Sequence, residues 1–253
     1  MTLLAGELYL LREKGRDQVE VYDVISYHLL CCLTVPDIYS DTVVDMISCE
    51  HYRCVYIGDD IGECVHRLDA QGAFTLWTVN DKPQGLSVNA AHNVIVACRV
   101  VRKIKEFSSH GDLLREIALP NDVNWPWHVI QTHSGQFIVC HGGPDDPVHR
   151  VCVMSADGRH IAHSHGGQRG SDTGQYKVPC HLAVDDYEFV FVADFINRRV
   201  TLLSPTLQYV CQVVSRDQLK WWPNRLCLDT ERRLLYVAVN EWTAGRVVMI
   251  SVM

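Results

Sequence analysis

The chain has 253 residues, of which 47% are hydrophobic and 21% are charged, and its formal net charge is −7. This composition is ordinary for a globular protein, and the acidic balance argues against bulk attraction to DNA or to an anionic membrane. No stretch rich in Gly, Ser or Pro divides the chain, so we expect one domain spanning residues 1–253.

The N-terminus and the cysteines indicate the compartment. Residues 1–11 are apolar but lack a basic start, and Glu7 interrupts them, which favours a strand over a signal peptide. No apolar run reaches the ~18 residues of a membrane helix. The eleven cysteines form no Cys-x-x-Cys pair, and most lie in apolar runs, as do Cys98, Cys152 and Cys211. We therefore expect a cytoplasmic protein with reduced thiols that are mostly buried.

Short β-branched and aromatic runs recur along the chain, each bounded by Gly, Pro, Asp or Asn, whereas no clear amphipathic helix is seen. The main runs are Cys54–Gly58, Val94–Cys98, Phe137–Cys140, Phe189–Ala193 and Leu234–Val239. This spacing predicts an all-β chain, because sandwiches, barrels and propellers place strands at such intervals.

A longer period distinguishes among these folds. The motif Pro-x-x-(Leu or Val) begins at Pro83, Pro126, Pro179 and Pro223. A basic residue followed by an apolar one comes later in each repeat, at Lys103, Arg150, Arg199 and Arg246. Four strands in a repeat of roughly 40–50 residues are typical of a β-propeller blade.

The repeats predict six blades. Their expected ranges are 1–36, 42–79, 83–119, 126–165, 179–214 and 223–253. Blade one shows three strands, at Gly6–Leu11, Gln18–Ile25 and His28–Val35, so it is expected to lack its inner strand, and blade six its outer strand. Because a closed ring needs both edges paired, we expect an upstream stretch of ~10–20 residues to supply them. The chain is therefore interpreted as the C-terminal part of a larger protein.

Residues 166–204 carry the most specific pattern. It comprises Gly174-Gln175-Tyr176, Pro179-Cys180-His181-Leu182-Ala183-Val184-Asp185, Val192-Ala193-Asp194 and Asn197-Arg198-Arg199-Val200. This pattern resembles the NHL repeat, strongly in blade five, fairly in blades three and six, and weakly in blades one and two. The resemblance implies a six-bladed propeller of NHL type. It also implies structural roles for Asp194, Asn197 and Arg199, since an acid and a base near one turn can pair.

NHL domains commonly lie at the C-terminus of larger proteins, notably tripartite-motif ubiquitin ligases, where they recruit targets. The chain has no RING, B-box or coiled coil. The resemblance therefore implies a non-catalytic module that binds a protein or peptide partner, with no cofactor and no resident metal.

Departures from the family pattern suggest where that partner binds. At the near-axis glycine position, blade three has Gly85, but blades four, five and six have His128, His181 and Arg225. Tryptophans flank the prolines that start two blades. In NHL propellers the loops before strand a and between strands b and c share one face. We therefore expect a binding surface at the channel mouth, made of Trp125, Trp127, His128, His181, Trp222 and Arg225. The alternative for each tryptophan is packing between blades.

Two other functions stay open. Some NHL propellers bind single-stranded RNA, and basic clusters occur at Arg99, Arg102 and Lys103, at Arg198 and Arg199, and at Lys220 and Arg225. Peptide-amidating lyase is a similar propeller that holds zinc through histidines. His128 and His181 would be two such ligands, but no clear third ligand is evident. Catalytic motifs such as Gly-x-Ser-x-Gly or a P-loop are absent from the sequence, so we do not expect an enzyme.

Overall fold

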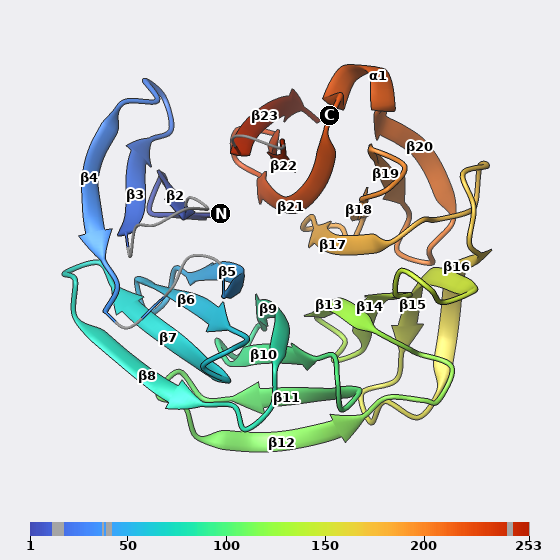
Figure 1. Ribbon diagram of the computed structural model, residues 1–253, viewed down its shortest axis with the longest axis horizontal. Helices are drawn as coiled ribbons and strands as arrows, with labels where there is room; N and C mark the ends of the chain where they lie inside the picture. The colour runs from blue at the N-terminus through green and yellow to red at the C-terminus, as the bar shows by residue number, and fades with distance from the viewer. Residues whose placement is uncertain (12–17, 37, 39–41, 242–244, 253) are drawn as a thin grey trace.

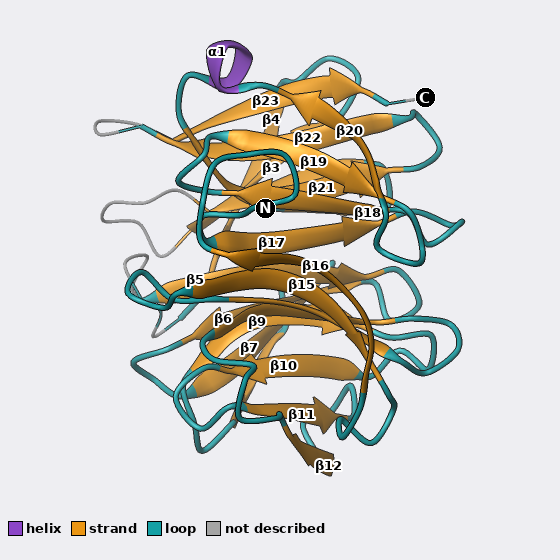
Figure 2. Ribbon diagram, turned by 90° about the vertical axis from the view of Figure 1, so that its right-hand side faces the viewer, coloured by secondary structure: helices purple, strands orange, loops and turns teal. Residues whose placement is uncertain are grey.

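The computed structural model describes residues 1–11, 18–36, 38, 42–241 and 245–252. Its strands form six small antiparallel sheets around a central axis (Figure 1). Seen from the side, the strands run between two faces that are built of loops (Figure 2). The prediction of an all-β, six-bladed propeller is therefore confirmed. Within the described ranges, no helix has the length and apolar character needed to cross a membrane.

The first three blades follow one another along the chain, each with four strands. Their bounds are β1 (Thr2–Leu4), β2 (Glu7–Leu11), β3 (Gln18–Asp23) and β4 (Leu29–Thr34); β5 (Val43–Cys49), β6 (Cys54–Asp59), β7 (Cys64–Asp69) and β8 (Phe74–Thr78); β9 (Pro83–Val88), β10 (Val94–Cys98), β11 (Lys103–Phe107) and β12 (Leu113–Ala118).

The last three blades complete the ring, with the short helix α1 (Arg216–Leu219) between blades five and six. Their strands are β13 (Pro126–Gln131), β14 (Phe137–His141), β15 (Val148–Met154) and β16 (Ile161–Gln168); β17 (Pro179–Val184), β18 (Val190–Asp194), β19 (Arg199–Leu203) and β20 (Tyr209–Val214); β21 (Trp222–Asp229), β22 (Leu234–Asn240) and β23 (Gly245–Ser251).

Blade one differs from the prediction. It has four strands, because Thr2–Leu4 forms a short inner strand that pairs with β2. Ala5 and Gly6 connect the two strands, both with positive φ (51° and 76°), as a tight two-residue hairpin turn requires. The prediction that blade one lacks its inner strand is therefore wrong, since Gly6 belongs to the turn and not to a strand. Blade six has three strands among its described residues, as predicted.

The core consists of apolar layers between neighbouring blades. In blades three, four and five the second strand is buried along its whole length, because both of its faces meet another blade. One layer, for example, joins Ile95 of β10 to Val129 of β13 and Phe137 of β14. Outer strands are exposed instead. Cys98 and Cys152 are therefore buried as expected, but Cys211 on outer strand β20 is exposed, contrary to the prediction.

Two features of the NHL-like pattern have the structural roles expected of them. The buried Asp194 carboxylate accepts hydrogen bonds from Asn197 Nδ2 at 2.7 Å and Arg199 Nε at 2.9 Å. At Gly85 an added Cβ would lie 2.4 Å from the carbonyl oxygen of Trp127. The glycine is therefore needed where inner strands of neighbouring blades approach closely.

Candidate functional site

Five inner strands each place one residue at an equivalent position near the axis. The equivalence follows from the pairing of each with the second strand of its blade, which joins Asp45 to Gly58, Gly85 to Ala97, His128 to Cys140, His181 to Ala193 and Arg225 to Ala238. Sequence reasoning identified four of these positions and missed Asp45. Blade two begins with Val43-Val44 where the others have proline, so the motif search did not align it, although its spacing to Gly85 fits the repeat.

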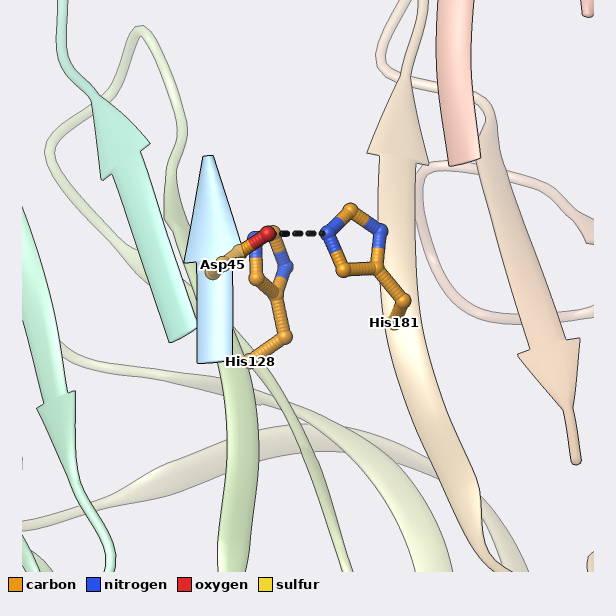
Figure 3. A group of neighbouring side chains, drawn as sticks. All are labelled: Asp45, His128 and His181. Carbon is orange, nitrogen blue, oxygen red and sulfur yellow. Dashed lines mark ion pairs between the residues drawn. The ribbon is translucent and has the colours of Figure 1, made fainter. Parts of the chain in front are cut away.

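Asp45, His128, His181 and Arg225 form a polar cluster, which we call the axis cluster. The imidazoles of His128 and His181 stack with ring centroids 3.9 Å apart. The Asp45 carboxylate lies 3.6 Å from His128 Nε2 and 3.5 Å from His181 Nε2 (Figure 3). Arg225 Nε lies 3.0 Å from Asp45 Oδ1. Asp45 and the two histidines are buried, so their side chains face one another and not a partner on the surface.

Burial and charge fix the protonation of this cluster. Burial by itself would raise the pKa of Asp45, but the Arg225 guanidinium and the two imidazoles hold that pKa well below its usual range. Burial lowers the pKa of His128 to about 3, and the neighbouring His181 adds to the effect. Burial also lowers the pKa of His181. At neutral pH the cluster is therefore an Asp45–Arg225 ion pair beside two neutral imidazoles.

The axis cluster has the ligand types of a zinc site but not the electrostatics of one. Asp45 supplies the third ligand that sequence reasoning lacked, since its oxygen and the two histidine nitrogens lie within 4.8 Å of one another. Arg225, however, already neutralises the carboxylate and would repel a divalent cation. His128 Nε2 lies 2.9 Å from the Leu86 carbonyl oxygen, to which it donates, so this nitrogen carries a proton and has no lone pair for a metal. These residues do not fit a zinc ion.

Trp125 and Trp127 lie together at the start of blade four, with ring centroids 6.2 Å apart. Trp125 is 38% exposed, and the Arg99 guanidinium lies 4.6 Å from its ring centroid. Trp127 is half-buried; its Nε1 donates a hydrogen bond to the Gly142 carbonyl oxygen, and its ring packs against the core layers. Trp125 is therefore a surface residue, whereas Trp127 mainly packs between blades.

The same arrangement recurs two blades further on. Trp222 is half-buried and stacks on Phe195, with ring centroids 6.3 Å apart. The Arg198 guanidinium lies 4.5 Å from the centroid of the Trp222 ring. Each arginine belongs to a turn between the second and third strands, and each tryptophan lies where the next blade begins. These two kinds of loop therefore share one face, as expected, and we call it the channel-mouth face.

A cavity of about 610 Å³ opens on the channel-mouth face beside Trp222. Its lining includes four cationic side chains and one acidic one: Lys177, Arg198, Arg199, Arg216 and Asp217. Arg199 forms an ion pair with Asp194. Arg198 also donates a hydrogen bond to the Lys220 carbonyl oxygen. Sequence reasoning missed Lys177 and Arg216, because loops from different repeats come together only in the folded ring. We call this the basic cavity.

A second cavity of about 610 Å³ lies between blades six and one. Its walls are largely apolar and include Tyr22, Tyr27 and Tyr236, and its lining also contains Asp45 and Arg225. The six predicted binding residues thus fall into three groups. His128, His181 and Arg225 belong to the axis cluster, Trp125 and Trp127 to the start of blade four, and Trp222 to the basic cavity.

No family model matches the chain, and no curated protein matches it. Solved structures do match. A protein of unknown function from Bacteroides caccae is similar with a TM-score of 0.71 and 11% identity, over 98% of this chain and 90% of that one. The β-propeller domain of Cps50 (Swd1) from Myceliophteria thermophila gives 0.66 and 10%, over 98% and 94%. Virginiamycin B lyase from Staphylococcus aureus gives 0.65 and 9%, over 98% and 82%. At these identities the likeness establishes the fold, a β-propeller, and six sheets make it six-bladed.

Proposed function

We propose that this chain is an NHL-type propeller that binds an acidic segment of a protein partner at its basic cavity. The observation that supports this proposal most directly is a group of cations around Trp222, in a chain whose net charge is −7. These cations are Lys177, Arg198, Arg199 and Arg216. Such a local excess of positive charge attracts anionic groups. The recruiting role is the one that the NHL resemblance implies for the C-terminal domains of tripartite-motif proteins.

The cavity offers both charge and apolar contact. Arg198 is oriented by the Trp222 ring and by the Lys220 carbonyl oxygen, so its guanidinium is held in place before a ligand arrives. A preorganised guanidinium pairs with a carboxylate through two parallel hydrogen bonds at low entropic cost. Trp222 and the exposed Ile196 provide apolar surface beside it. An extended peptide with carboxylates near an apolar or aromatic residue complements this arrangement.

The axis cluster supports a binding module over an enzyme. One structural neighbour is a lyase, so the fold alone does not separate the two classes. In this chain, however, the Asp45 carboxylate is paired with Arg225 and accepts hydrogen bonds from the backbone N–H groups of Met46 and Leu86. A charge that is satisfied in this way stabilises the ring and is poorly placed to act on a substrate.

Single-stranded RNA is the competing ligand for the same face, because unpaired bases stack on aromatic rings and phosphates bind arginine. A peptide is favoured because acidic residues lie beside the cations. Asp217 lines the cavity, and the exposed Asp172 contacts Arg199 through its backbone carbonyl oxygen. These carboxylates repel a continuous phosphate backbone more than they repel a peptide with a few separated charges.

The test is a selection of linear peptides from a display library on the immobilised chain. Enriched peptides are expected to be acidic, and fluorescence anisotropy then gives their affinities. Trp222→Ala should weaken binding by about 30-fold, the effect of losing a hot spot of about 2 kcal/mol. Trp125→Ala, the matched change outside the basic cavity, should alter affinity by less than about threefold.

Two outcomes would count against the proposal. The basic cavity is not the binding site if the enriched peptides contain no acidic residues. It is also not the binding site if they bind Trp222→Ala with the same affinity as the unchanged chain. An unstructured RNA oligonucleotide that binds at low salt, loses affinity steeply as salt rises and depends on Trp222 would replace the peptide as the ligand.

A further inference from the structure

We propose that Asp59, Cys64 and His66 form a zinc site at the turn between β6 and β7 in blade two. This site is separate from the basic cavity and from the axis cluster, and nothing in the proposed peptide-binding function requires it. The inference rests on three observations: the three side chains converge, Cys64 lies opposite the aspartate where blade five has Arg199, and a glycine leaves room beside the ligand atoms.

The hairpin brings the three side chains together. Asp59 ends β6 and Cys64 begins β7, and the two residues are directly opposite in the ladder. Cys64 and His66 are two residues apart on one strand, so their side chains lie on the same face of the sheet. All three are buried, with exposed fractions of 4%, 6% and 1%. A cysteine, a histidine and a carboxylate in one buried group are a zinc-type ligand set.

Blade five has an aspartate at the same position, with different neighbours. Asp194 is the counterpart of Asp59, and its Oδ2 accepts hydrogen bonds from Asn197 Nδ2 and Arg199 Nε. Counting along the turn from each aspartate, blade two has Gly62 where blade five has Asn197. Likewise, Cys64 takes the place of Arg199 opposite the aspartate. Both donors to the carboxylate oxygen, including the cation, are therefore replaced in blade two.

The remaining contacts of Asp59 leave one of its oxygens directed at the cluster. Its Oδ1 accepts hydrogen bonds from the backbone N–H groups of Ile61 and Gly62. Its Oδ2 faces His66 Nε2 at 3.6 Å. A buried carboxylate is costly unless a positive charge offsets it. A divalent cation at this point would supply the charge that Arg199 supplies in blade five.

The distances agree with tetrahedral coordination. Cys64 Sγ lies 3.2 Å from His66 Nε2, and Asp59 Oδ2 lies 3.6 Å from the same nitrogen. Ligands at ordinary zinc distances are separated by about 3.4–3.6 Å around a tetrahedral centre. Both neighbours face one imidazole nitrogen, whereas a nucleophile and an acid in a catalytic triad use opposite nitrogens. The geometry is that of converging ligands and not of a charge-relay chain.

Gly62 keeps the ligand atoms accessible. A Cβ at this position would lie 2.7 Å from Asp59 Oδ2 and 3.1 Å from Cys64 Sγ. Without a side chain at Gly62, the space beside these two atoms stays open. The backbone of Gly62 is not in the left-handed region, so the glycine is not required by its φ angle. Space beside the two ligand atoms is a reason for a glycine here.

Zinc binding would leave the buried cluster without net charge. When Zn²⁺ binds, a zinc–sulfur bond forms and the thiol proton leaves to solvent. The two positive charges of zinc then balance one thiolate and one carboxylate, so the buried centre is neutral.

The axis cluster offers a useful contrast. There too a buried carboxylate, Asp45, lies beside histidines, but Arg225 supplies the positive charge. In the part of the chain that the structure describes, Asp59 pairs with His66, and this partner is positively charged only when its imidazole is protonated. The two clusters therefore solve the same electrostatic problem in different ways, and blade two is the one suited to zinc.

The experiment is titration of the purified, metal-free chain with CoCl₂ and then ZnSO₄. Cobalt bound to a thiolate gives a sulfur-to-metal charge-transfer band in the near ultraviolet. We expect each chain to bind one equivalent of cobalt and to show this band. Zinc should then displace the cobalt, and the band should disappear. Cys64→Ser should abolish the band. Cys98→Ser, the matched loss of another buried thiol from the neighbouring blade, should leave it unchanged.

Gly62→Ala is the sharper variant, because it changes no ligand and fills the space beside two of them. It should weaken cobalt binding at least tenfold, a loss typical of damage around a metal site, while the far-ultraviolet circular dichroism stays the same. If Cys64→Ser does not fold, Gly62→Ala decides. The proposal is overturned if the unchanged chain gives no charge-transfer band, or if a folded Cys64→Ser keeps the band. If Cys64→Ser does not fold, the proposal is overturned when Gly62→Ala binds cobalt as tightly as the unchanged chain.

Discussion

Replacing Arg225 by leucine tests the electrostatics of the axis cluster. Arg225 Nε lies 3.0 Å from Asp45 Oδ1, and the Asp45 side chain is 1% exposed. Removing one partner of a buried ion pair leaves an uncompensated charge and costs about 3–5 kcal/mol. We therefore expect Arg225→Leu to lower the free energy of unfolding by about 4 kcal/mol at pH 7. The midpoint of thermal unfolding should fall by about 10 °C.

A matched control lies in the same blade. Arg246 Nε is 2.7 Å from Glu241 Oε2, and the two side chains are 65% and 15% exposed, against 15% and 1% for Arg225 and Asp45. The same arginine-to-leucine change should cost only about 1 kcal/mol there, because solvent reaches this pair and exposed ion pairs contribute little. Urea denaturation followed by circular dichroism measures both. The double variant Asp45→Asn/Arg225→Leu should recover about half of the loss, since no unpaired charge remains. Equal costs at Arg225 and Arg246 would refute this account of the axis.

Two further predictions concern the axis. Gly85→Ala should destabilise the fold by about 1–3 kcal/mol in urea denaturation, because the added Cβ would lie 2.4 Å from the Trp127 carbonyl oxygen; an unchanged midpoint would contradict this close approach. The pH dependence follows from His128, whose pKa burial lowers to about 3. Above about pH 6.5 His128 is neutral in both the folded and the unfolded chain, so it does not lower the free energy of unfolding there. Below that pH the unfolded chain takes up a proton on this histidine, whereas the folded chain does not. His128 alone should therefore lower the stability by about 1.4 kcal/mol per pH unit between about pH 6 and pH 4, and His128→Gln should reduce the measured slope by that amount.

Much of the ring could be predicted from the sequence, because each blade repeats the same pattern. Proline before an inner strand and a basic residue at the start of the third strand located blades three to six. The resemblance to the NHL repeat implies that Asp194 and Arg199 pair, and Asp194 Oδ2 and Arg199 Nε are 2.9 Å apart. These features are local to one repeat, so one sequence is enough to find them.

Other features could not be predicted, because they depend on contacts between repeats. β1 has three residues and no motif, so the sequence does not distinguish it as a separate inner strand within residues 1–11. Asp45 lacks the preceding proline, and its role appears only where it meets Arg225 from another blade. Cys211 lies in an apolar run, but its strand is the outermost one and faces solvent.

The candidate sites show the same limit. A search for Cys-x-x-Cys pairs does not find a ligand set made of Asp59 opposite Cys64 and His66 across a hairpin. The basic cavity joins Lys177, before blade five, to Arg216, before blade six. The pairing of β6 with β7 creates the first arrangement, and the closed ring creates the second.

The most direct test of the central claim is a pair of charge reversals measured with one acidic peptide from the selection. Arg216→Glu changes an exposed residue of the basic cavity. Arg159→Glu makes the same change in the turn between β15 and β16, on the opposite face, where the side chain is 80% exposed. We predict that Arg216→Glu weakens the peptide at least tenfold, as expected from like-charge juxtaposition, and that Arg159→Glu leaves its affinity unchanged. Equal affinities of the two variants for the peptide would contradict the claim that the basic cavity is the binding site.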